Sequence, residues 1–127
     1  KFSLNLTDKP IVITARGHSR GRDGKNHTDS KTKLVTILIY LNEEWTSQNG
    51  RLRILNSDDI DDYTDEFSAS FGQMIAFKVT DDCWHGYLPY DGKRQSLQIN
   101  YLADQKHSKY HLYRHKISAF FKNIFSS

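Results

Sequence analysis

The chain contains the run Leu34-Val35-Thr36-Ile37-Leu38-Ile39-Tyr40-Leu41, which is apolar at nearly every position. The run is too short for a comfortable helix, and its β-branched residues favour a strand. We therefore predict a buried strand. Because side chains alternate along a strand, Thr36, Leu38 and Tyr40 share one of its faces.

Four more segments on either side of this run have the composition or the alternation of strands. They are Pro10–Ala15, Arg51–Leu55, Gln73–Val79 and Ser96–Leu102. Asn49-Gly50 is a favourable hairpin turn, so Arg51–Leu55 is predicted to be the strand that returns from the central run. Five or more short strands joined by Gly- and Asp-rich turns predict an antiparallel sandwich or barrel.

Two connections between these strands have a distinctive charge. Residues 17–25 are rich in glycine and are predicted to be a loop, whose arginines and lysine are either solvated or meet an anionic ligand. Asn56–Glu66 holds six acidic residues without the spacing of an EF-hand. This favours a solvated acidic loop or short helix over a calcium site.

The C-terminal segment has a different periodicity. Apolar residues recur at helical spacing from His111 to Phe125, so we predict an amphipathic helix over about 110–125. Its apolar face would pack on the barrel or on a partner subunit, and the second case would give a homo-oligomer. Alternatively, the helix would lie on a membrane surface. His107, His111 and His115 fall four apart, which would align them on one face of the helix. They would form either an exposed polar face or a zinc site.

Length and charge limit the classes of protein. The 127 residues suit one compact domain with a barrel core over about 10–103. The net charge of +3 is the sum of +5 in residues 1–33, −7 in residues 34–93 and +5 in residues 94–127. The sequence lacks the stripe of basic residues interleaved with aromatic residues that is typical of nucleic-acid-binding proteins, so nucleic acid is not the expected partner. No apolar run reaches the roughly 20 residues that cross a bilayer. The single cysteine, Cys83, excludes an internal disulfide, and we expect a cytoplasmic protein.

His27 and Asp29 form a His-x-Asp pair. In an extended segment their side chains point to the same side. One imidazole and one carboxylate supply two of the three ligands of the 2-His-1-carboxylate site that holds Fe(II). On its own the pair is more often a feature of a solvated strand, so its meaning depends on a second histidine.

The last predicted strand leaves a choice open between its two faces. Its polar residues alternate with its apolar residues, namely Arg94, Ser96, Gln98 and Asn100 against Leu97, Ile99 and Tyr101. Either the apolar face is the core side, or Arg94, Ser96 and Gln98 line a cavity. Periodicity alone does not decide between them.

Together these residues resemble the 2-oxoglutarate- and Fe(II)-dependent dioxygenases, most closely small bacterial members of their prolyl-4-hydroxylase-like branch. The resemblance covers about residues 27–102, with His27 and His85 58 positions apart and Arg94 9 positions after His85. The matching elements, in order, are His27-Thr28-Asp29, Ile39-Tyr40-Leu41-Asn42 with Trp45, Asn49-Gly50-Arg51-Leu52-Arg53-Ile54, Trp84-His85-Gly86 and Arg94-Gln95-Ser96.

The resemblance implies a mainly β fold, the double-stranded β-helix or cupin-like jelly roll, in a single dioxygenase domain over 1–127 that lacks N-terminal elements of its relatives. It implies that His27, Asp29 and His85 are the catalytic Fe(II) ligands. The expected ligands of the cosubstrate 2-oxoglutarate are Arg94, Tyr40 and Ser96.

The reaction implied by the resemblance consumes molecular oxygen, hydroxylates a small-molecule or peptidyl substrate, and converts 2-oxoglutarate into succinate and CO2. Ascorbate is an expected auxiliary. A non-catalytic cupin-like metal- or ligand-binding module or sensor is the alternative, distinguished by the lack of turnover. A surface-binding module that uses its basic ends is a third hypothesis.

Overall fold

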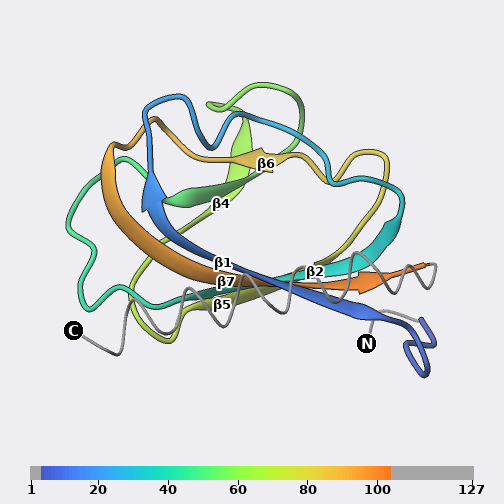
Figure 1. Ribbon diagram of the computed structural model, residues 1–127. Helices are drawn as coiled ribbons and strands as arrows, with labels where there is room; N and C mark the ends of the chain where they lie inside the picture. The colour runs from blue at the N-terminus through green and yellow to red at the C-terminus, as the bar shows by residue number, and fades with distance from the viewer. Residues whose placement is uncertain (1–3, 104–127) are drawn as a thin grey trace, which may run out of the picture.

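The computed structural model describes residues 4–103, in which seven strands form two antiparallel sheets in two layers (Figure 1). The strands are β1 (Ile11–Ser19), β2 (Lys33–Tyr40), β3 (Leu52–Leu55), β4 (Tyr63–Phe67), β5 (Met74–Lys78), β6 (His85–Gly86) and β7 (Gly92–Leu102). The prediction of a mainly β, antiparallel fold is confirmed. The helix predicted over 110–125 and the three C-terminal histidines lie outside the described residues.

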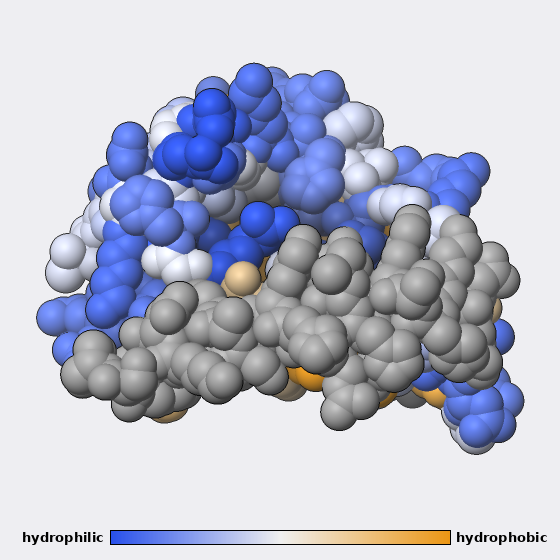
Figure 2. Space-filling model, in the orientation of Figure 1, coloured by the Kyte–Doolittle hydropathy of each residue, from blue (hydrophilic) through white to orange (hydrophobic). Residues whose placement is uncertain are grey.

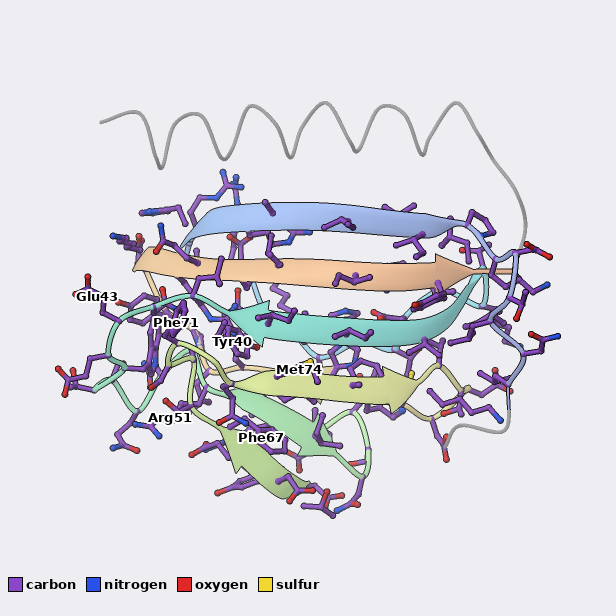
Figure 3. All side chains as sticks on the ribbon, turned by 90° about the horizontal axis from the view of Figure 1, so that it is seen from below. Tyr40, Glu43, Arg51, Phe67, Phe71 and Met74 are labelled. Carbon is purple, nitrogen blue, oxygen red and sulfur yellow. The ribbon has the colours of Figure 1, made fainter. Side chains whose placement is uncertain are left out.

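The larger sheet has the order β1-β7-β2-β5, and Figure 3 shows these strands side by side. The central run forms β2, whose Ile37 pairs with Ile99 of β7 and Ala76 of β5. The predicted loop at 17–25 begins later than expected. A register shift after Arg16 lets the strand continue through His18 and Ser19, which pair with the start of β7.

The smaller sheet has the order β4-β3-β6, and it corrects the predicted hairpin. Leu52–Leu55 pairs with β4 and β6 and not with β2. Gly50 does reverse the chain with a φ of 77°. In the connection before it, Trp45 is buried and its Nε1 donates to the Asn49 carbonyl oxygen at 3.0 Å. This connection takes the chain from the larger sheet to the smaller one.

The acidic segment was wrongly expected to be loop or helix throughout, because Tyr63–Phe67 is strand β4. This strand lies at the edge of the smaller sheet, and most of its side chains are exposed on both faces. No apolar alternation is therefore present in its sequence to reveal it. The surface over the smaller sheet and its loops is largely hydrophilic (Figure 2).

The hydrophobic core joins the two layers. Its buried members come from both sheets and the loops between them: Leu38, Tyr40, Trp45, Leu52, Ala69 and Ile75. Burial of such side chains contributes about 1.5–3 kcal/mol each for the larger ones. Within residues 4–103 the structure contains no helix able to cross a membrane.

Candidate active site

His27 and His85 lie opposite each other in a short antiparallel bridge. His27 N donates to the His85 carbonyl oxygen at 3.0 Å, and His85 N donates to the His27 carbonyl oxygen at the same distance. This short bridge pairs His27 with β6, and the two ring centroids lie 4.4 Å apart. Residues 58 positions apart in the sequence are thereby neighbours.

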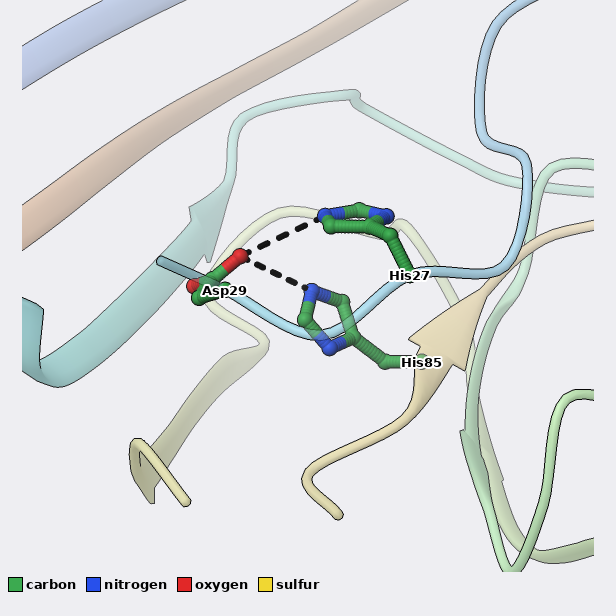
Figure 4. A group of neighbouring side chains, drawn as sticks. All are labelled: His27, Asp29 and His85. Carbon is green, nitrogen blue, oxygen red and sulfur yellow. Dashed lines mark ion pairs between the residues drawn. The ribbon is translucent and has the colours of Figure 1, made fainter. Parts of the chain in front are cut away.

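Asp29 completes a three-residue cluster, with its carboxylate facing both rings (Figure 4). Its Oδ1 lies 3.3 Å from His27 Nε2 and 3.5 Å from His85 Nε2. Two ligand atoms about 2.1 Å from one ion are about 3.0 Å apart at right angles and about 3.4 Å at the tetrahedral angle. All three ligand atoms lie within 4.8 Å of one another, so the cluster can hold one metal ion.

The histidine tautomers also fit a metal. His27 Nδ1 lies 2.9 Å from the Lys25 carbonyl oxygen, and His85 Nδ1 lies 2.8 Å from the Cys83 carbonyl oxygen. Because a carbonyl oxygen only accepts, each Nδ1 carries the proton. In the neutral ring, Nε2 then keeps its lone pair as a ligand. Two nitrogens and one carboxylate oxygen are a donor set suited to Fe(II).

The protonation of Asp29 suits a ligand. Burial alone raises the pKa of this carboxyl group, but hydrogen bonds from Thr36 and, when their rings carry a proton on both nitrogens, from His27 and His85 lower it by more, so the pKa lies far below its ordinary value. Asp29 is therefore ionised at neutral pH. The hydrogen bond to Asp29 in turn raises the pKa of His27 above its ordinary value.

Arg94 is buried and lines the same cavity as His27, Asp29 and His85. Its Nε donates to the Gly50 carbonyl oxygen at 2.9 Å, and its Nη2 donates to the Tyr40 hydroxyl oxygen at 3.2 Å. Its Cζ lies 3.8 Å from the centre of the Tyr87 ring. Burial raises the pKa of Tyr40, which keeps the phenol protonated. Ser96 is only 3% exposed and is the ladder partner of Tyr40.

One cavity of about 410 Å³ contains the histidine–aspartate cluster at one part of its wall and Arg94 at another. Ser96 and Gln98 also line it, so the polar face of β7 points inward. Of the two alternatives for this strand, the one in which Arg94, Ser96 and Gln98 line a cavity is therefore correct. Leu97, Ile99 and Tyr101 are only half-buried on the other face. All six residues expected at the site thus line the same cavity: His27, Asp29, Tyr40, His85, Arg94 and Ser96.

Sequence reasoning missed three contributions to this site. Tyr87, whose ring lies against Arg94, is two residues after His85, and alternation from His85 would have pointed to it. The Gly50 carbonyl oxygen left no signal, because a backbone acceptor is not specified by residue type. Thr36 was assigned to the correct face, but its hydrogen bond to Asp29 was not foreseen.

The model of the 2OG-Fe(II) oxygenase superfamily matches residues 14–102. The chain belongs to this superfamily. The match includes every residue of the site described above, from His27 to Ser96. No curated protein matches the chain.

A solved structure shares the oxygenase fold. The chain is similar to a prolyl-4-hydroxylase from Pseudomonas putida, with a TM-score of 0.60 and 22% sequence identity over 75% of this chain. The match covers 52% of that protein, so the chain spans about half the length of the structure it resembles. At this identity the similarity establishes the fold.

Proposed function

We propose that the chain is an Fe(II)- and 2-oxoglutarate-dependent dioxygenase that hydroxylates a small-molecule or peptidyl substrate. The observation that carries the proposal is the position of His27, Asp29 and His85 in one cavity with the buried guanidinium of Arg94. A metal site and an anion site in one enclosure are what an oxygenase with a dicarboxylate cosubstrate requires. We further propose that the two sheets form the double-stranded β-helix expected from the sequence.

The proposed metal ligands are His27 Nε2, His85 Nε2 and Asp29 Oδ1. Three protein ligands leave further positions of Fe(II) open for the cosubstrate and for oxygen. When bound, iron supplies the activation of O2 that couples decarboxylation of 2-oxoglutarate, yielding succinate and CO2, to hydroxylation of a substrate C–H bond. The protein contributes the geometry: the Lys25 and Cys83 carbonyl oxygens fix the rings, and Asp29 is ionised before metal arrives.

The proposed cosubstrate site is centred on Arg94. Its guanidinium is held by Gly50 and Tyr40, so donors not used by these partners remain for a carboxylate. The hydroxyl groups of Tyr40 and Ser96 line the cavity beside it and are proposed to donate to the same carboxylate. Being buried, this ion pair would be weakly screened by salt.

The prime substrate is proposed to enter beside β1, the edge strand of the larger sheet. Arg16 and His18 of this strand are exposed and line the cavity, and so does Lys33 at the start of β2. The mouth of the cavity is therefore open and polar, in contrast with the buried wall around Arg94. A surface of this kind accepts a polar metabolite or an exposed peptide side chain.

The test is succinate formation from 2-oxoglutarate, measured with and without Fe(II) and ascorbate, in the presence of a metabolite or protein extract. We expect iron-dependent succinate and a gain of one oxygen atom in a component of the extract. Both signals should disappear in His27→Ala and Asp29→Ala and persist in Asp65→Ala, an exposed carboxylate on β4. Folded protein that binds Fe(II) without turnover would favour the non-catalytic module instead.

A further inference from the structure

Behind Asp29, a row of polar side chains crosses the inner face of the larger sheet. Thr36 and Asn100 are ladder partners on β2 and β7 and are 1% and 2% exposed. Gln98 lies two residues before Asn100 on the same face of β7 and lines the cavity. Buried polar groups of this kind are costly unless every one is hydrogen-bonded.

These side chains form a chain of hydrogen bonds that ends on Asp29. Gln98 Nε2 donates to Asn100 Oδ1 at 3.0 Å, and Asn100 Nδ2 donates to Thr36 Oγ1 at 2.9 Å. Thr36 Oγ1 donates to Asp29 Oδ2. We call the three donors, Gln98, Asn100 and Thr36, the relay.

The direction of the relay is fixed by its end. Thr36 donates its single hydroxyl proton to Asp29 Oδ2. The lone pairs of Thr36 are then free to accept from the Asn100 amide. Reversing both amides would turn the Thr36 proton away from Asp29 and leave an oxygen lone pair against a carboxylate.

The relay acts on one oxygen of Asp29 and leaves the other free. Oδ2 is occupied by Thr36, whereas Oδ1 is the atom that faces His27 Nε2 and His85 Nε2. We propose that the relay is a positioning device that makes Asp29 a single-oxygen ligand, and that Thr36 is its principal residue. The proposal rests on the metal site of the proposed function, and concerns residues that do not themselves touch the metal.

The experiment compares Thr36→Val, which keeps the shape and removes the hydroxyl, with Thr36→Ser, which keeps the hydroxyl. Mn(II) binding is titrated by calorimetry without 2-oxoglutarate, and the Co(II) absorption spectrum reports the ligand arrangement. Changes next to metal ligands typically weaken metal affinity about 10- to 100-fold. We expect a loss of this size in Thr36→Val with an altered Co(II) spectrum, and affinity within about threefold of wild type in Thr36→Ser.

Three controls separate positioning from a loss of fold. Thermal unfolding of each metal-free variant shows whether the protein is folded at the temperature of the binding titration. In an Asp29→Ala background, Thr36→Val should weaken the residual Mn(II) binding no further, because the relay then has no carboxylate to orient. Asn100→Leu should weaken binding less than Thr36→Val, since it leaves the Thr36 hydroxyl in place.

The possible failures are distinguishable. If wild-type protein binds Mn(II) and folded Thr36→Val binds it equally tightly with an unchanged Co(II) spectrum, the relay has no positioning role and the proposed function stands. If Thr36→Ser is as impaired as Thr36→Val, the hydroxyl is not the cause and the inference is wrong. If folded wild-type protein binds no Mn(II), both the inference and the proposed function fail.

Discussion

The Nε of Arg94 donates a 2.9 Å hydrogen bond to the carbonyl oxygen of Gly50, a residue 44 positions earlier in the chain. This bond links β7 of the larger sheet to the turn that leads into β3 of the smaller one. It fixes one edge of the guanidinium, while Tyr40 and Tyr87 fix its other edge and its plane. The cavity wall that is proposed to receive 2-oxoglutarate is therefore built by both layers.

Replacing Arg94 should weaken cosubstrate binding without affecting the metal. A hydrogen bond to a charged group is worth about 1.5–3 kcal/mol, which corresponds to roughly 10- to 100-fold in affinity. We expect Arg94→Ala to raise the Kd for 2-oxoglutarate by at least this factor while the Kd for Mn(II) stays the same. Calorimetry gives both values. Lys93→Ala, which removes the exposed neighbouring cation, is the matched control, and equal losses in the two variants would contradict the assignment.

Gly50→Ala should destabilise the protein more than Gly72→Ala. Both glycines have positive φ, 77° and 86°, and a left-handed conformation costs a non-glycine residue about 1–2 kcal/mol. A Cβ at residue 50 would also lie 2.6 Å from Trp45 Cζ2, whereas a Cβ at residue 72 meets nothing within 4 Å. Overpacking adds about 1–3 kcal/mol. Urea unfolding measures the difference, and equal destabilisation would show that Trp45 moves aside without cost.

Asn42 should contribute strongly to stability because it joins three segments. Its buried side chain donates to the Ala69 and Gln95 carbonyl oxygens at 2.7 and 3.2 Å, and accepts from Gln95 N at 2.8 Å. Leaving a buried polar group unpaired costs about 1–3 kcal/mol, so Asn42→Ala should lower the free energy of unfolding by about 2–4 kcal/mol.

The control for Asn42 is Asn56→Ala, which removes an exposed hydrogen bond to Asp62. Its cost should stay below about 1 kcal/mol in the same urea titration. If the two substitutions had similar effects, the contacts of Asn42 would not hold the segments together.

The pKa of His27 in the metal-free protein should lie above its ordinary value of about 6.5, because Asp29 hydrogen-bonds to it. A raised folded-state pKa contributes stability that is complete below about pH 6.5 and is lost as the pH rises through the folded pKa. NMR titration of the His27 ring checks the direction. In Asp29→Asn the pKa should fall, and a wild-type value at or below 6.5 would contradict the hydrogen bond.

Several elements could be predicted because their sequence carries the needed pattern. The run around Ile37 is buried and β-branched, which identifies β2, and alternation correctly put Thr36, Leu38 and Tyr40 on one face. The shared site of His27, Asp29 and His85 was predicted from the resemblance of the sequence to a family of dioxygenases. The structure brings them together, and their role as ligands stays a proposal.

Other features could not be read from the sequence because they depend on tertiary contacts. Asn49-Gly50 has the composition of a hairpin turn, but the next strand, Leu52–Leu55, pairs with β4 and β6 and not with the strand before the turn. Residues Tyr63–Phe67 are exposed on an edge, so burial leaves no pattern in them. The polar face of β7 is buried because it surrounds a cavity, a fact that periodicity alone does not contain.

The most direct test of the central claim is an anaerobic titration of the metal-free protein with Fe(II), followed by 2-oxoglutarate, monitored by visible absorption. We expect one Fe(II) per chain and a charge-transfer band on addition of 2-oxoglutarate, with both lost in folded Asp29→Ala. A wild-type protein that is folded and yet binds no Fe(II), or an Asp29→Ala variant that gives the same band at the same affinity, would contradict it.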